Sequence, residues 1–230
     1  MELKPWYPRD FALALSNTFS DEEVTLFLKQ PGSSPRFVYG ILMLPTVLKY
    51  YLDADQGYRI DQAMTQATLF GYQLHRFTES STPVIARSSD PTAVVEGMLI
   101  FDLDEHQRNA IYELESGLMC LASVQVDICQ RGRHDRVHSL RKVDAGTFAW
   151  TGSMEGLVPL KSAAWNVDEF LQAPFYRYIS ESRSRSALKA SESVGAMYQG
   201  VFMERRKGYT SSVVGEVSLY RIDEEPGSAW

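Results

Sequence analysis

The clearest periodic pattern in the chain is an alternation of apolar and polar residues near its middle. The alternating residues are, in order, Ala122, Ser123, Val124, Gln125, Val126, Asp127 and Ile128. Because successive side chains of a strand point to opposite faces, this spacing predicts a half-buried strand. Segments rich in β-branched and aromatic residues predict further strands, at residues 36–39, 67–78, 94–103, 137–143 and 147–151. Residues 80–91 are polar, contain prolines and predict a loop.

Helices are predicted where a capping residue precedes apolar residues at helical spacing. The capping residues are Ser20 with Glu23, Asp104 with Gln107, and Asn166, for helices over about 20–29, 104–115 and 166–178. Pro45 suits the first position of another helix, where its missing N–H costs nothing. Residues 180–196 are polar and predict either a helix or a linker, and residues 201–205 and 213–222 a hairpin. The mixture predicts an α+β fold with mostly antiparallel strands.

Composition limits the classes of protein to consider. The 230 residues fit one domain, and the net charge is −6 without a long basic run, so we expect no nucleic-acid partner. The longest apolar stretch, residues 37–48, contains Gly40 and Pro45 and is too short to span a bilayer. Cys120 and Cys129 lack CxxC spacing, which favours two buried thiols in a reducing compartment. With no secretory signal in residues 1–10, we expect a cytoplasmic protein without a membrane partner.

One candidate site is the segment in which a strand, a glycine and a helix start follow one another. Gly40 ends the strand at 36–39, and Pro45 begins the helix. The first N–H groups of a helix lack partners inside it, so residues 39–42 are placed to donate to a carboxylate or an oxyanion. The simpler interpretation is that Gly40 only makes a turn after a strand.

Glu115 is the candidate proton-transfer residue. It lies near the predicted end of the helix at 104–115, close to Ile111, Leu114 and Leu118. Burial and the negative helix end both disfavour its charged form, which predicts a raised pKa and suits a proton shuttle. The simpler interpretation is an exposed helix residue, paired with Arg108 or with nothing.

The histidines offer weaker candidates for a site. His75 falls in the predicted strand at 67–78, where we interpret it as structural, with a place in the pocket as the alternative. His134 and His138 flank a turn with Asp135 but have no third ligand nearby. We therefore expect no metal site.

Four segments, in order, resemble the gamma-glutamylcyclotransferase-like family, in the branch that includes avirulence-induced plant proteins. The first is residues 37–42, which are similar to the family's strand and YGxL loop. The second is residues 67–97, with Pro83 in the loop and Gly97 in the next strand. The third is residues 111–126, where Glu115 falls at the family's catalytic glutamate. The fourth is residues 149–178, similar to the closing strand and helix. The resemblance covers about 36–180.

The resemblance implies a fold, a reaction and a set of residues. The fold is a mixed, mostly antiparallel β-barrel flanked by helices at residues 36–180, with extensions at 1–35 and 181–230. The reaction cyclises a gamma-glutamyl group of a small-molecule substrate to 5-oxoproline and releases an amine, without a cofactor. Glu115 is then catalytic. The substrate-binding residues are Tyr39, Gly40, Ile41, Leu42, Pro83 and Met119.

The chain also departs from the family around Glu115. The family usually has Asp, then Phe-Glu-Gly, then Tyr and Arg, and the corresponding differing residues here are Tyr112, Leu114, Ser116, Met119 and Leu121. These changes keep a second interpretation open, a cofactor-independent cyclase, isomerase or lyase of a specialised metabolite. A third is a non-catalytic binding module. The terminal extensions could shape the pocket or a homodimer contact.

Overall fold

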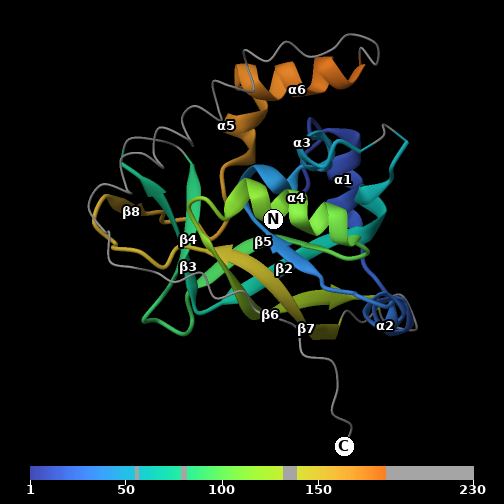
Figure 1. Ribbon diagram of the computed structural model, residues 1–230, viewed down its shortest axis with the longest axis horizontal. Helices are drawn as coiled ribbons and strands as arrows, with labels where there is room; N and C mark the ends of the chain where they lie inside the picture. Colours follow the sequence, from blue (N-terminus) through green and yellow to red (C-terminus); the bar gives the residue numbers. More distant parts are fainter. Residues whose placement is uncertain (55–56, 79–81, 132–138, 185–230) are drawn as a thin grey trace, which may run out of the picture. The chain divides into compact units, whose positions relative to one another are not determined.

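The computed structural model describes residues 1–54, 57–78, 82–131 and 139–184. All of these belong to one compact unit, residues 1–190 (Figure 1). The predicted hairpin at 201–205 and 213–222 lies outside the described residues, as does most of the polar segment at 180–196.

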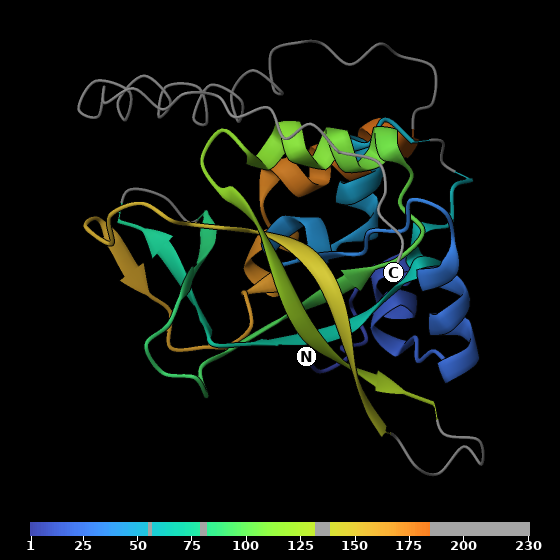
Figure 2. The same cartoon turned by 60° about the horizontal axis from the view of Figure 1, so that its bottom comes forward.

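A closed five-stranded barrel is the centre of this unit (Figures 1 and 2). Its strands follow the order β1 (Arg36–Val38), β5 (Val94–Ile100), β2 (Met64–Phe70), β6 (Cys120–Gln130) and β7 (Ser139–Ala149). Every neighbouring pair is antiparallel except β1 and β7, which are parallel where Arg36 pairs with Gly146. The expected α+β fold with a mixed, mostly antiparallel barrel is therefore confirmed.

The alternation predicted around residues 122–128 is confirmed in β6. Val124, Val126 and Ile128 are buried, whereas Ser123 and Gln125 are exposed. The two strands predicted at 137–143 and 147–151 are wrong as separate elements, because β7 is continuous from 139 to 149. The ladder with β6 runs through the glycine-containing stretch between them without a break. Residues 137 and 138 are outside the described part.

A second, three-stranded sheet has the order β4 (Pro83–Arg87), β3 (Tyr72–Phe77) and β8 (Leu157–Pro159). The single strand predicted at 67–78 is wrong, because Gly71 has a φ of +74° and separates β2 from β3. The prediction of a loop throughout residues 80–91 is also wrong, because β4 forms there. Its middle residues are buried and pair with β3, and the strand begins at Pro83, a position where a missing N–H is tolerated.

Helices cover the barrel on several sides (Figures 1 and 2). They are α1 (Arg9–Ser16), α2 (Asp21–Lys29), α3 (Pro45–Tyr51), α4 (Glu105–Glu115), α5 (Val167–Leu171) and α6 (Pro174–Ser184), with short 3-10 turns η1 (Gly40–Met43) and η2 (Ile60–Ala63). Both predicted capping boxes, the cap at Asn166 and the first-position proline of α3 are confirmed. The single helix predicted over 166–178 is wrong, because Pro174 begins a second helix after a short break.

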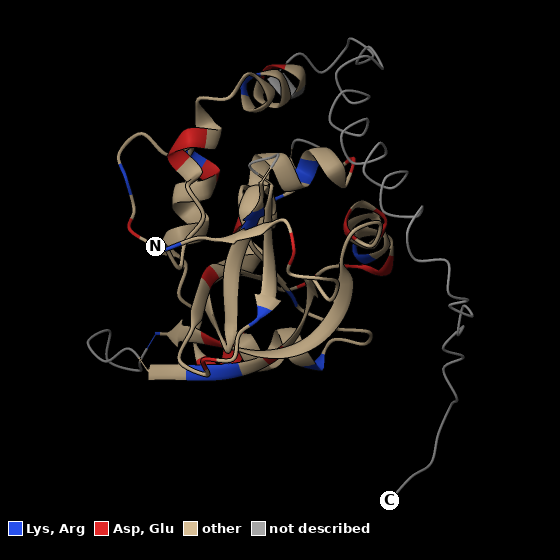
Figure 3. Cartoon of the chain, turned by 90° about the vertical axis from the view of Figure 1, so that its left-hand side faces the viewer, with Lys and Arg blue, Asp and Glu red and all other residues tan. Residues whose placement is uncertain are grey.

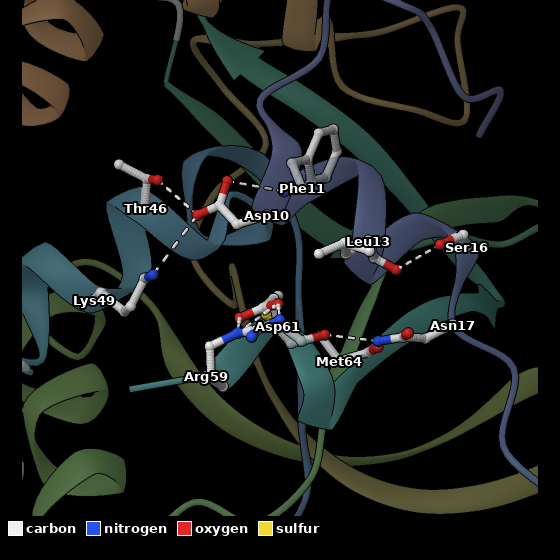
Figure 4. A network of polar contacts seen from close by, with 10 residues as sticks. All are labelled: Asp10, Phe11, Leu13, Ser16, Asn17, Thr46, Lys49, Arg59, Asp61 and Met64. Carbon is white, nitrogen blue, oxygen red and sulfur yellow. Dashed lines mark hydrogen bonds and ion pairs between the residues drawn. The ribbon is translucent and has the colours of Figure 1, made fainter. Parts of the chain in front are cut away.

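The segment before β1 packs onto the barrel through polar contacts, seen in Figure 4. The Asn17 side-chain amide donates to the backbone oxygen of Met64 at 2.9 Å. On α1, Asp10 accepts from the Thr46 hydroxyl at 2.6 Å and lies 3.8 Å from the Lys49 ammonium, both on α3. These contacts hold α3, and with it the turn η1 that precedes it.

Charged residues of both signs are spread over different elements of the described chain (Figure 3). Within that part of the chain, no helix is both long and apolar enough to cross a membrane.

Candidate active site

Tyr39, which follows β1, joins three other parts of the fold through its hydroxyl group. The side chain is buried. Its oxygen lies 2.8 Å from the backbone oxygen of Phe148 and 2.9 Å from Met119 Sδ, and its proton can be donated to either. The N–H of Ile85 on β4 donates to the Tyr39 oxygen at 3.4 Å. The residue is thus held between β4, β7 and the start of β6.

Gly40 follows directly and allows the chain to pass close to Pro83. Its φ of +65° lies in the left-handed region, which residues with a Cβ adopt at a cost. A Cβ there would lie 2.7 Å from Cγ of Pro83, inside van der Waals contact. Glycine is therefore required on two independent grounds, and the predicted loop residues Gly40 and Pro83 are in contact.

The turn after Gly40 is the 3-10 turn η1, which leads into α3. Ile41 is half-buried, and the Leu42 side chain is buried in the core at 2% exposure, so Leu42 has only its backbone to offer a ligand. No hydrogen bond between this turn and another described element uses the N–H of Gly40 or Ile41. Both are among the first N–H groups of the turn, which lack partners inside it.

Glu115 is the last residue of α4, whose start is set by the Asp104 capping box. The residue is half-buried, and burial raises the pKa of its carboxyl to about 7. Its backbone oxygen accepts from the N–H of Met119 at 3.0 Å. Burial, and secondly the nearby charge of Glu115, raise the pKa of Tyr39 well above its ordinary value. The charge of Glu115 thus acts on the Tyr39 hydroxyl, and Met119 contacts both residues.

The predicted site residues therefore form one connected group. Met119 contacts both Glu115 and the Tyr39 oxygen, and Gly40, which follows Tyr39, contacts Pro83. Such a group combines a carboxyl that titrates near neutral pH with N–H donors at the start of a helical turn. It can therefore transfer protons and hold an anionic or polar oxygen.

The residues that depart from the family pattern surround this group. Tyr112 is 50% exposed and Leu121 is 44% exposed. The Tyr112 ring lies 5.9 Å from that of Phe148, the residue paired with Leu121 across β6 and β7. Met119 is buried, and Ser116 is half-buried. The surface next to Glu115 is thus largely apolar and aromatic.

Sequence reasoning missed two partners of Tyr39. The backbone oxygen of Phe148 and the backbone N–H of Ile85 both contact its hydroxyl. Every residue carries such backbone groups, so no side-chain motif marks these two positions. Only the pairing of distant strands brings them to Tyr39.

His75 pairs with Val84, the residue after Pro83, and Cys120 directly follows Met119, but among the described residues neither side chain hydrogen-bonds to this group. His75 is buried on β3, with Nδ1 3.0 Å from the backbone oxygen of Gln73. His134 and His138 are outside the described residues. In the described part of the chain, no group of three His, Cys, Asp or Glu side chains could hold a metal ion. The prediction of two buried thiols is wrong, because Cys120 is exposed at the start of β6 and Cys129 is half-buried; both are free.

Solved structures resemble the chain at low sequence identity. A protein of Arabidopsis thaliana is 22% identical, with 68% of this chain and 83% of that chain covered and a TM-score of 0.43. A gamma-glutamyl cyclotransferase is 17% identical, with 81% and 94% covered and a TM-score of 0.40. A yeast gamma-glutamyl cyclotransferase specific to glutathione is 15% identical, with 77% and 96% covered and a TM-score of 0.33. Values this low add nothing to the family assignment.

The family assignment rests on a match over the barrel and the candidate site. No curated protein matches the chain. The model of one protein family, described as gamma-glutamyl cyclotransferase, AIG2-like, matches residues 36–167, more than half of the chain. That range includes Tyr39, Gly40, Pro83, Glu115 and Met119. The chain belongs to the AIG2-like gamma-glutamyl cyclotransferase family.

Proposed function

We propose that this protein is a gamma-glutamyl cyclotransferase that releases 5-oxoproline, with Glu115 as the proton-transfer residue. Family membership supports a cyclotransferase-type enzyme. The observation that carries the finer proposal is the Glu115 carboxyl, with a pKa of about 7, beside the buried Tyr39. Near neutral pH such a carboxyl is present in both forms, so it can accept a proton and return it.

The reaction needs only one proton to move between two nitrogens. The α-amino nitrogen of the gamma-glutamyl group attacks the γ-carbonyl carbon, which forms the C–N bond of 5-oxoproline. Glu115 takes a proton from the attacking nitrogen and gives it to the leaving nitrogen as the original amide bond breaks. The substrate is thereby converted to 5-oxoproline and an amine, with no atom gained or lost.

The turn after β1 supplies the second requirement, stabilisation of negative oxygen. The N–H groups of Gly40 and Ile41 are the donors we assign to the substrate's α-carboxylate or to the oxyanion that forms on the γ-carbonyl. Gly40 permits the left-handed backbone with which this turn begins. The contact with Pro83 holds this turn in place.

The test is 5-oxoproline formation from a panel of gamma-glutamyl amino acids, gamma-glutamyl amines and glutathione. Wild type is compared with Glu115→Gln, which keeps the side-chain shape but removes the proton-accepting carboxylate. Glu113→Gln is the matched control, since Glu113 lies on the same helix and is exposed. We expect product from wild type and the control, and a loss of about a hundredfold or more in Glu115→Gln. Equal rates in all three would refute the role of Glu115.

A second candidate is a cyclase, isomerase or lyase that acts on a more apolar specialised metabolite. The observation that favours it is the apolar and aromatic surface made by Tyr112, Leu121 and Phe148 beside Glu115. Failure of the whole panel to give 5-oxoproline would reject the first proposal and favour this one. If no tested metabolite were then converted, a non-catalytic binding module would become the better interpretation.

A further inference from the structure

Arg36, the first residue of β1, is a half-buried cation with an incomplete set of partners. Its Nη1 donates to the Ser34 hydroxyl at 2.6 Å and to the Ser34 backbone oxygen at 3.2 Å. Its Nε is buried and has no hydrogen-bond partner. Among the ion pairs of the described residues, none involves Arg36. A buried donor without a partner is costly.

Arg108, on α4, is a second cation near the first. Its Nη1 donates to the backbone oxygen of Leu103, and its Nη2 lies 3.9 Å from the position that a Cβ on Gly32 would take. Gly32 and Ser34 are two residues apart, so their Cα atoms are separated by at most about 7 Å. The two guanidinium groups therefore flank one short loop, and within the described residues no carboxylate forms an ion pair with either.

The electrostatics agree with this geometry. Burial, and secondly the positive charge of Arg108, lower the pKa of Arg36. A half-buried cation with a second cation nearby is stabilised by a bound anion. Guanidinium groups also match the planar geometry of carboxylates with two parallel N–H donors. The arginine pair, defined as Arg36 and Arg108, has the properties of a carboxylate site.

A strip of apolar surface leads from the arginine pair towards Glu115. Arg108, Tyr112 and Glu115 are spaced by four and then three residues, so they share one face of α4. The Tyr112 ring lies 5.9 Å from that of Phe148, which pairs with Leu121. Leu121 Cδ1 and Arg36 Nη1 in turn lie 3.2 Å and 2.9 Å from the position that a Cβ on Gly146 would take. Along α4, Arg108 and Glu115 are about 10 Å apart at a rise of about 1.5 Å per residue.

We propose that the arginine pair binds the terminal carboxylate of the substrate's leaving group. The preferred substrates are then peptides in which a gamma-glutamyl group is joined to a dipeptide, and this dipeptide has an apolar first residue and a free terminal carboxylate. The inference rests on the proposed function, because it places the scissile bond at Glu115. A dipeptide leaving group carries its carboxylate about 7 Å from the new amine, within reach of the long arginine side chains. Tyr112 and Leu121 contact the apolar residue between the two ends.

The experiment compares gamma-glutamyl-leucyl-glycine with the same peptide ending in a carboxamide. Steady-state kinetics are measured for wild type, Arg36→Gln, Arg108→Gln and the control Arg177→Gln, which removes an exposed cation from α6. We expect each of the first two changes to raise KM for the free acid about tenfold, since a charge-assisted bond is lost. KM for the carboxamide should hardly change, and the control should match wild type. Equal effects on acid and amide would overturn the inference.

Equilibrium binding separates this inference from the proposed reaction. The dissociation constants of both peptides are measured by calorimetry on Glu115→Gln, alone and combined with each arginine change. If wild type releases no 5-oxoproline, the proposed function fails. A preference for the acid that either arginine change abolishes would still support the carboxylate site. Equal binding of acid and amide, or binding of neither, overturns it. Arg36→Lys, which keeps the charge, should retain part of the preference if Arg36→Gln proves unstable.

Discussion

Replacement of Glu115 by Gln should stabilise the folded protein, and the gain should depend on pH. The carboxyl has an ordinary pKa of 4.5, and burial raises it to about 7 in the folded state. The folded protein therefore binds the proton more tightly than the unfolded chain. This contribution to stability is fully present below the unfolded pKa near 4.5 and is lost progressively as the pH rises to about 7. A glutamine side chain stays neutral, so the variant does not lose this stability as the pH rises.

The magnitude follows from the two pKa values. They differ by about 2.5, and each pKa unit corresponds to about 1.4 kcal/mol, so the ceiling is about 3.5 kcal/mol. Glu115 is only half-buried as a residue, and water reduces the penalty on a partly exposed charge. We therefore expect Glu115→Gln to exceed wild type by about 1–2 kcal/mol at about pH 8, and by much less at about pH 5.

The assay is urea unfolding at about pH 5 and about pH 8, followed by circular dichroism and fluorescence. Glu113→Gln is the matched control, because that exposed side chain on the same helix should show no pH-dependent gain. A difference between Glu115→Gln and wild type that is the same at both pH values would refute the reasoning. If Glu115→Gln were less stable than wild type at about pH 8, the reasoning would also be refuted, because the folded state would then favour the charged carboxylate.

Three further outcomes test the site more widely. Gly40→Ala should lower the free energy of unfolding by about 1–3 kcal/mol more than Gly71→Ala does. Both glycines have positive φ, but only at Gly40 would the added Cβ clash with Pro83. Equal losses in urea unfolding would contradict that contact. Tyr39→Phe should lower the free energy of unfolding by about 1–2 kcal/mol in the same assay, because the Phe148 oxygen loses its donor. An unchanged midpoint of urea unfolding would contradict this hydrogen bond. The rate of 5-oxoproline formation should rise with pH through about 7 as the Glu115 carboxyl ionises, and a flat profile from about pH 5 to about pH 8 would exclude that carboxyl as the base.

Several elements could be predicted from the sequence because their causes are local. The capping boxes at Ser20 and Asp104 each need a partner only three residues away. The alternation in β6 follows from the two faces of a strand, and Pro45 suits a helix start wherever that helix packs. The family resemblance predicted the barrel, and it identified Glu115 and the YGxL turn as site residues.

The remaining features depend on residues that are far apart in the chain. Gly71 interrupts what looks like one strand, and β4 forms in a polar segment because β3 pairs with it. Local propensity carries no information on which distant strands pair, so it predicted a continuous strand at 67–78 and a loop at 80–91. The pairing in space of strands distant in sequence decided both.

The chemistry of the site was likewise divided between sequence and tertiary structure. The sequence by itself determined that Glu115 ends a helix in apolar company and that Gly40 follows a strand. Only the tertiary structure placed Glu115 beside Tyr39, brought Pro83 against Gly40, and left Arg36 near Arg108 without a carboxylate partner among the described residues. Burial and charge proximity set pKa values and ligand preference, and both arise from how distant segments pack, which no short window of sequence contains.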